Sequence, residues 1–112
     1  MDKLNNYRAI IKQTLNNLAN YGSSPGRIDE YAVCDETTDN YILSNVGWHP
    51  SGRRQLGYPV HVRIKDQKVW VEWDGTDQEI IQQLIDAGID ENDIVLGWDK
   101  PEEFRYSELK AA

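Results

Sequence analysis

Few side chains of this chain are spaced for catalysis. The two histidines, His49 and His61, fall in different parts of the sequence, and the single cysteine, Cys34, precedes both. Ser51 lies close to His49, but closeness in sequence alone does not make a catalytic triad, which also needs a third group that orients the base. The sequence has no CxxC or HExxH metal motif and no phosphate-binding glycine loop. We therefore predict no catalytic residue, no metal site and no cofactor.

The residue types best suited to recognition lie between positions 48 and 54. Trp48 and His49 are followed, after a short loop, by the adjacent arginines Arg53 and Arg54. A guanidinium binds phosphate or carboxylate through two parallel hydrogen bonds, and tryptophan adds a flat stacking surface. These four residues are a candidate contact for a protein partner or for nucleic acid. The alternative is a polar loop whose arginines serve only solubility.

A second set of candidate residues comes from a predicted β-hairpin over residues 60–73. Apolar and polar residues alternate here with the period of a strand that has one buried face. With Asp66 and Gln67 as the turn, three apolar pairs share that face: Ile64 with Val69, Val62 with Val71, and Val60 with Trp73. A two-residue turn requires positive φ at both positions, which glutamine disfavours. A four-residue loop with the same pairing is therefore the alternative.

The opposite face of this hairpin holds charged and aromatic candidates. There His61 is expected opposite Glu72, and Arg63 opposite Trp70. The first pair predicts a cross-strand ion pair on a solvated face, and the alternative is a histidine base with an orienting carboxylate. The second pair predicts either a cation–π contact within the sheet or half of an exposed interface. These four residues are the candidate subunit interface of a homo-oligomer.

A helix and two strands precede the hairpin and must position it. Apolar residues recur every three or four positions over residues 4–20, which predicts an amphipathic helix with Asp2 as its cap. Residues 28–34 and 41–48 predict two antiparallel strands joined by a polar turn. Both faces of the second strand carry large apolar groups, so this strand is expected to be central or to meet another subunit. Cys34 is expected to be a small core residue.

A helix and a strand are predicted after the hairpin. Thr76 and Glu79 have the capping-box spacing that begins a helix, and Gly88 has the position of a left-handed residue that ends one. Its buried stripe is Ile80, Ile81, Leu84 and Ile85. Residues 94–97 are wholly apolar, which is typical of an interior strand, and a crossover after the helix predicts that this strand runs parallel to a neighbour. The polar tail has apolar side chains that could dock on the protein or a partner: Phe104, Tyr106 and Leu109.

The predicted fold class is α+β in a single domain over residues 1–112: an N-terminal helix, a four-stranded mostly antiparallel sheet, a second helix and a final strand. The net charge of −7 argues against sequence-independent DNA binding, which depends on positive charge. Four tryptophans and six tyrosines are many for 112 residues, and such aromatics are enriched at protein contacts. A lone cysteine, and no membrane span or signal peptide, favour the cytoplasm.

The order of short motifs along nearly the whole chain resembles the XisI family, the fdxN-element excision controlling factor proteins found mainly in cyanobacteria. The N-terminal half carries Tyr7-Arg8-Ala9-Ile10-Ile11, Asp39-Asn40-Tyr41, Leu43, Val46-Gly47-Trp48 and Arg53-Arg54. The C-terminal half carries His61, Lys68-Val69-Trp70-Val71, Asp74-Gly75-Thr76, Ala87-Gly88-Ile89, Asp93-Ile94-Val95-Leu96-Gly97 and Pro101-Glu102. The number and order of these pieces make the resemblance specific.

The resemblance implies an accessory protein that controls a site-specific DNA rearrangement during heterocyst differentiation. In that setting a separate recombinase cuts and rejoins the DNA, and the accessory protein acts with a XisH-like partner. The resemblance implies no catalytic residues. Two alternatives remain open: a regulatory factor that binds DNA directly through Arg53 and Arg54, and a small ligand-binding domain or enzyme around His49, His61 and Cys34.

Overall fold

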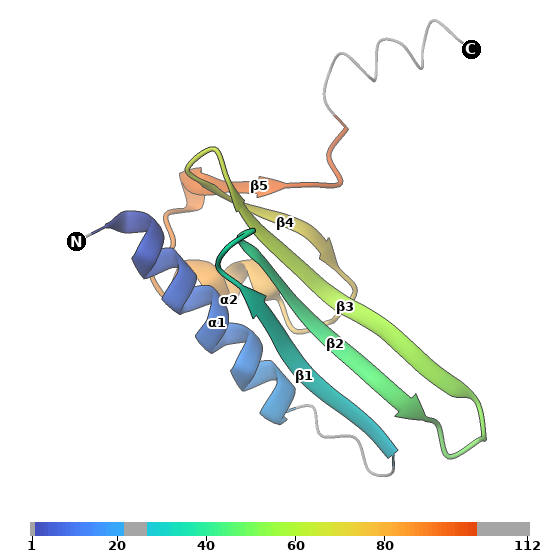
Figure 1. The fold of residues 1–112 in the computed structure, drawn as a ribbon. Coiled ribbons are helices and arrows are strands. Elements are labelled where there is room, and N and C mark those ends of the chain that lie inside the picture. Colours follow the sequence, from blue (N-terminus) through green and yellow to red (C-terminus); the bar gives the residue numbers. More distant parts are fainter. Residues whose placement is uncertain (1, 22–26, 101–112) are drawn as a thin grey trace, which may run out of the picture.

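The computed structural model describes residues 2–21 and 27–100, which form two α-helices and one five-stranded sheet (Figure 1). In chain order the elements are α1 (Lys3–Tyr21), β1 (Arg27–Asp35), β2 (Asn40–Trp48), β3 (Arg54–Lys65), β4 (Lys68–Asp74), α2 (Ile80–Asp86), the short 3-10 helix η1 (Glu91–Asp93) and β5 (Ile94–Leu96). The α+β class and the predicted element order are confirmed. No helix of the described ranges is long and apolar enough to cross a membrane.

The sheet has the strand order β1-β2-β3-β4-β5, so each strand lies beside its neighbour in sequence. The first four strands are antiparallel, and β5 pairs in parallel with β4 after the crossover through α2. The predicted parallel direction of the last strand is confirmed. Its predicted interior place is wrong, because β5 lies at the edge of the sheet and its three residues are only half-buried.

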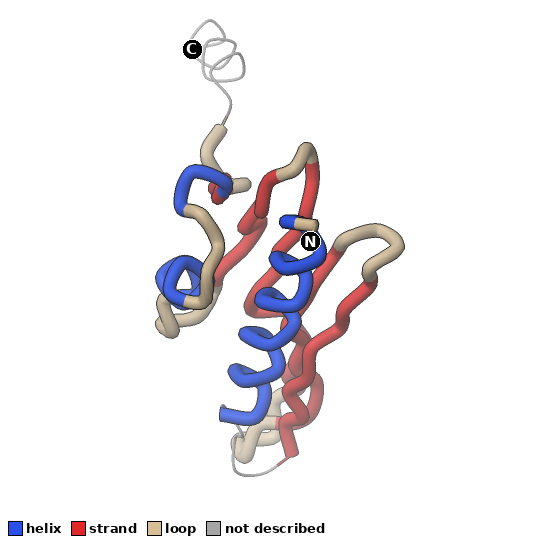
Figure 2. Tube along the Cα trace, turned by 90° about the vertical axis from the view of Figure 1, so that its left-hand side faces the viewer, coloured by secondary structure: helices blue, strands red, loops and turns tan. Residues whose placement is uncertain are grey.

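Both helices lie on one side of the sheet and form the core with its inward-facing residues (Figure 2). Helix α1 begins at the predicted cap, where the Asp2 carboxylate accepts a hydrogen bond from the Leu4 amide at 3.0 Å. The buried apolar residues of the core are Tyr7, Ile11, Leu15, Leu18, Tyr41, Leu43, Val60, Val62, Ile64, Val69, Val71, Ile80, Leu84 and Ile89. The other side of the sheet carries no helix among the described residues.

The β3–β4 hairpin has the two-residue turn that the alternation predicts. Asp66 and Gln67 have φ of 54° and 65°, the positive values that a type I′ turn requires, so the longer loop is excluded. The pairs Ile64–Val69, Val62–Val71 and Arg63–Trp70 are confirmed.

A β-bulge changes the register beyond these pairs. The bulge lies between His61 and Val62, and as a result His61 pairs with Trp73 and Val60 pairs with Asp74. Glu72 is the extra residue of β4. The predicted pairs Val60–Trp73 and His61–Glu72 are therefore wrong, and Trp73 lies half-exposed outside the core.

A second bulge lies where β2 pairs with β3. Leu43 pairs with Val60 and Asn45 pairs with Gly57, so β3 has one residue more than β2 between these pairs. Pro59 lies in this interval, where a residue without an amide donor removes no regular ladder hydrogen bond. The predicted loop of residues 49–55 is shorter than expected, because β3 already begins at Arg54.

Helix α2 begins later than the capping box predicts. Its N-cap is Glu79, which has φ of 53° and makes no side-chain capping hydrogen bond. The Thr76 hydroxyl donates to Asp74 and accepts from the Gln78 amide, so it orders the loop before the helix instead. The C-terminus is as predicted: Gly88 has φ of 123°, and the Ile89 amide donates to the Leu84 carbonyl at 3.0 Å.

Two further predictions concern single side chains. Cys34 is exposed near the end of the edge strand β1, so the prediction that it belongs to the core is wrong. Burial of part of its surface raises the pKa of the Cys34 thiol. The predicted docking of Phe104, Tyr106 and Leu109 lies outside the residues that the structure describes.

Candidate functional site

The side of the sheet opposite the helices, which we call the outer face, carries most of the exposed large apolar side chains of the described chain. Side chains alternate along a strand, and paired residues of antiparallel strands share a face. The residues that alternate with the buried positions of β1–β4 therefore point to the outer face. Its apolar members are Tyr31, Val33, Ile42, Val46, Trp48, Leu56, Tyr58, Trp70 and Trp73.

These side chains are exposed to an unusual degree for apolar residues. Leu56 is 73% exposed, Tyr58 60%, and Trp73 52%. Monomeric proteins rarely expose contiguous apolar patches of several hundred Å², and larger ones mark sites of interaction. The outer face is therefore the strongest candidate for a binding surface on the described residues.

The structure brings the predicted patch of Trp48, His49, Arg53 and Arg54 to one end of the β2–β3 hairpin. Arg54 lies with its guanidinium carbon 5.0 Å from the centre of the Trp48 ring, in a cation–π contact. Trp48 and Arg54 are also cross-strand partners. The His49 amide donates to the Arg53 carbonyl at 2.8 Å, which closes the loop. Arg53 is exposed at the tip, whereas Arg54 covers its tryptophan.

The second predicted set lies at the other half of the same face, and its contacts differ from those expected. Arg63 forms an ion pair with Glu72, with 3.3 Å between the nitrogen and the oxygen. His61 instead makes a hydrogen bond of 2.8 Å to Asn40, so the predicted His61–Glu72 ion pair is absent. Burial lowers the pKa of His61, although the Glu72 charge opposes this shift. The histidine is therefore favoured in its neutral form.

Trp70 remains at the surface of the outer face. Its indole N–H donates to the Lys65 carbonyl at 3.0 Å, and the Lys65 ammonium lies 5.2 Å from the centre of the ring. The cation–π contact on Trp70 is thus made by Lys65, and the guanidinium of Arg63, its cross-strand partner, pairs with Glu72. Trp70 is only half-buried, so it is open to a further contact.

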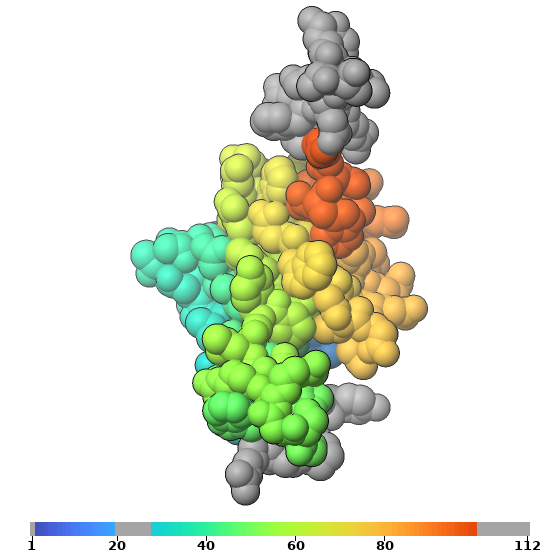
Figure 3. All heavy atoms as spheres, turned by 90° about the vertical axis from the view of Figure 1, so that its right-hand side faces the viewer, coloured from blue at the N-terminus to red at the C-terminus, as the bar shows by residue number. Residues whose placement is uncertain are grey.

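The bulge in β4 creates a hollow on the outer face. Tyr58, His61, Glu72 and Trp73 line it, and its volume is about 420 Å³. Trp73 folds back towards Gly75, where a Cβ would lie only 2.8 Å from the indole nitrogen. Figure 3 shows the green end of the β2–β3 hairpin at the lower edge of the molecule, beside the yellow surface of β4. The hollow offers two aromatic faces, one carboxylate and one imidazole.

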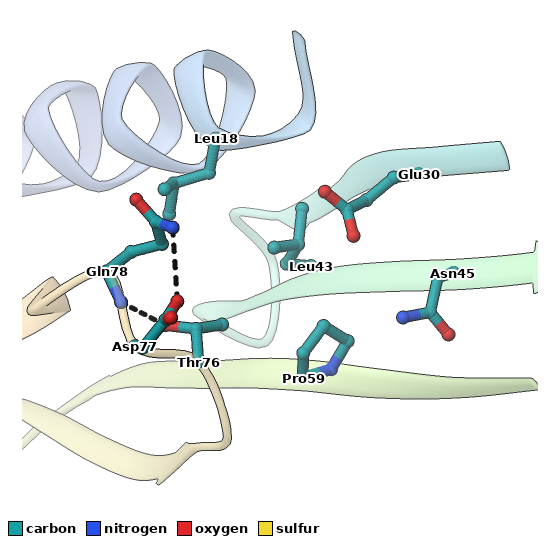
Figure 4. Close-up of a pocket in the computed structure, with 8 residues that line it drawn as sticks. All are labelled: Leu18, Glu30, Leu43, Asn45, Pro59, Thr76, Asp77 and Gln78. Carbon is teal, nitrogen blue, oxygen red and sulfur yellow. Dashed lines mark hydrogen bonds between the residues drawn. The ribbon is translucent and has the colours of Figure 1, made fainter. Parts of the chain in front are cut away.

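A smaller pocket lies on the inner side, between the C-terminal part of α1 and the sheet (Figure 4). Its volume is about 240 Å³, below the range of about 300–1,000 Å³ that is usual for ligand sites. Burial raises the pKa of the Glu30 carboxyl, which points towards Leu43 inside the pocket. The sequence reasoning missed Glu30. The feature that could have indicated Glu30 is a charged residue at an inward-facing position of β1, where it pairs with Asn45.

The residues of the enzyme alternative lie apart. Cys34 pairs with the buried Tyr41 and therefore points to the helix side, whereas His61 points to the outer face. His49 lies beyond the end of β2, in the loop at the far end of the hairpin. Among the described residues, no group of three or more His, Cys, Asp or Glu side chains could hold a metal ion. The three residues do not form one site.

Solved structures of similar fold include two from Anabaena variabilis ATCC 29413. The first, an fdxN element excision controlling factor XisI, is 29% identical with a TM-score of 0.74, over 91% of this chain and 98% of that chain. The second, a XisI-like protein, is 31% identical with a TM-score of 0.82, over 93% and 94% of the two chains. No curated protein matches.

The family comparison covers almost the full length of the sequence. The model of the XisI protein family matches residues 1–111. The solved relatives share the fold over more than nine-tenths of this chain. The chain therefore belongs to the XisI family.

Proposed function

We propose that this protein is a non-catalytic accessory factor that controls the site-specific excision of a DNA element and acts in the cytoplasm through protein contacts. The observation that carries the proposal is the similarity, over 91% of this chain, to a protein described as an fdxN element excision controlling factor. A separate recombinase would perform the chemistry. The proposal assigns no catalytic residue to this chain.

The charge of the chain supports action through protein partners. At −7, the protein as a whole repels a polyanion. Of the two adjacent arginines, Arg54 stacks on Trp48 and its Nη1 donates to the Gly47 carbonyl at 3.4 Å. Phosphate binding usually needs several free cations in one patch. An exposed arginine beside a tryptophan and a histidine is instead typical of a protein contact.

We propose a XisH-like protein as the partner and the hairpin end of Trp48, His49, Arg53 and Arg54 as its contact. Co-expression of the two proteins should give a complex that copurifies. Arg53→Glu should weaken this complex about tenfold to a hundredfold, because it reverses the charge at the exposed tip. The matched control is Lys12→Glu, which reverses a positive charge in the same way on α1, where Lys12 forms a surface ion pair with Glu36.

The experiment also tests direct DNA binding. If Arg53 and Arg54 bound DNA, the isolated protein would shift a DNA fragment at low salt, and the affinity would fall steeply as salt rises. Two separate peaks from the co-expressed proteins, together with such a salt-dependent shift, would refute the proposed function and support the DNA-binding alternative.

A further inference from the structure

We propose that the outer face of β1–β4, with Trp48 and Arg54 at its rim where they remain open to a protein partner, binds the same face of a second copy of this chain, which gives a two-fold dimer of packed sheets. The helices cover one side of the sheet, and no described segment covers the other. Sheets that pack face to face form the core of β-sandwiches, so this arrangement is a common one for two uncovered sheets. The proposal does not depend on the proposed function.

The outer face has the size of one side of a stable interface. Its four strands have 9, 9, 12 and 7 residues. With a rise of about 3.3 Å per residue and about 4.8 Å between strands, the face measures roughly 30 by 20 Å. That is roughly 600 Å² in projection, and the relief of the side chains adds to it. One side of a standard interface buries about 800 Å².

The charges of the chain favour a second copy at this face over one at the surface of α2 and η1. Residues 75–99 contain seven acidic side chains and no lysine or arginine. They belong to the segments that follow β4, so two copies that met through α2 and η1 would repel each other. The outer face has charges of both signs, among them Asp29, Arg54 and Lys65.

Three basic side chains of the outer face already have partners within one chain. Arg63 pairs with Glu72, while Arg54 and Lys65 stack on tryptophans. The free-energy cost of removing water from a charged group is smaller when the group already has a partner than when it is free. The face can therefore be covered by a surface that brings mostly apolar groups, which is what a second copy presents.

The outer face carries both a highly exposed apolar side chain and a hollow. Leu56 is the most exposed large apolar side chain of the described residues. The hollow lined by Tyr58, His61, Glu72 and Trp73 lies on the same face. Consider a two-fold axis that lies in the plane of the interface and passes midway between Leu56 and the hollow. Such an axis would place Leu56 of each copy in the hollow of the other. This relation is isologous, as symmetry requires.

Light scattering after size-exclusion chromatography tests the proposal on the full chain. The wild type should have twice the mass of 12.9 kDa at micromolar concentration. Leu56→Glu should raise the dissociation constant of the dimer at least about 100-fold, since each copy would bury an unpaired carboxylate. Because Leu56 is exposed, the melting temperature measured on dilute monomer should change little. Asn6→Glu, at an exposed position of α1, is the matched control and should remain dimeric.

Cross-linking tests the geometry independently. Ser44 points to the middle of the outer face, so Ser44→Cys with Cys34→Ser should give one linked dimer with a bismaleimide of about 10 Å, the separation of packed sheets. Asn6→Cys in the same background should remain unlinked. A wild-type monomer at every concentration, or a Leu56→Glu dimer as tight as the wild type, would overturn the proposal. The proposal would also be wrong if the wild type were a monomer and Leu56→Glu weakened only the binding of the XisH-like protein. In that case the outer face would be the contact for that protein.

Discussion

Replacing Gln67 by glycine should stabilise the protein, because it removes strain at the turn between β3 and β4. Gln67 has φ of 65°, a left-handed conformation that costs a residue with a Cβ roughly 1–2 kcal/mol. Glycine adopts this φ freely but loses about 0.5–1 kcal/mol more backbone entropy on folding. The difference is a net stabilisation of about 0.5–1 kcal/mol. For a domain of this size it should raise the melting temperature by about 2–5 °C.

Urea denaturation of the Gln67→Gly variant, followed by circular dichroism, measures this change. Gln67 is exposed, so loss of its side chain should remove little packing. Gln67→Ala is the control: alanine keeps the Cβ and its strain, so its stability should stay within about 0.5 kcal/mol of the wild type. A glycine variant that is no more stable than the alanine variant would refute the two-residue turn. It would favour the four-residue loop, which places no such demand on Gln67.

Three further predictions concern the core, acid stability and the thiol. Leu84→Ala should lower the free energy of unfolding by about 2–5 kcal/mol in urea denaturation, because Leu84 is buried in the core under α2; Gln82→Ala, on the exposed side of the same helix, should change it by less than about 0.5 kcal/mol. The Arg8 guanidinium holds the pKa of Asp39 below its usual value. The pair therefore stabilises the fold fully above the unfolded pKa of about 3.9, and this stabilisation is lost as the pH falls through the folded pKa. Asp39→Asn should accordingly reduce the loss of stability between pH 7 and pH 3. The raised pKa of Cys34 predicts slower alkylation by iodoacetamide at pH 8 than in urea-unfolded protein, and an equal rate would contradict it.

Periodicity predicted the elements well because most of them obey one rule along their length. The core positions of α1 follow the helical spacing, and Ile64, Val69 and Val71 follow the strand alternation. The cap at Asp2 and the left-handed Gly88 depend only on neighbours in sequence, so both were predictable.

The errors arise where a tertiary contact overrides a local rule. Trp73 fits the alternation perfectly, but the extra residue Glu72 turns it to the other face. The bulge is stabilised by partners distant in sequence: the Gly97 amide donates to the Val71 carbonyl at 2.8 Å, and a side chain at Gly97 would collide with Glu72. Nothing in residues 60–73 alone indicates this contact. The Thr76 capping box failed for a local reason, since Asp74, two residues away, accepts the hydrogen bond from the Thr76 hydroxyl.

The residues of the candidate site likewise fall into those that sequence could predict and those that only the tertiary structure brings together. Trp48, His49, Arg53 and Arg54 are close in sequence, and a short loop keeps them close in space. The hollow combines residues from β3 with residues from β4 that only the bulge brings together, so no sequence spacing could predict it. The pocket at Glu30 requires α1 to be placed over the sheet, which the sequence pattern does not specify.

The single extra residue of β4 has a consequence for how such a protein can evolve. Loss of one codon, that of Glu72, would restore the regular alternation and return Trp73 to the side of the helices. The hollow would lose one of its two aromatic walls and its carboxylate in the same event, while the other strands kept their pairing. A lineage can thus gain or lose this part of the surface through one in-frame deletion or insertion. Relatives should accordingly fall into two discrete groups, with and without the bulge, and not into a graded series.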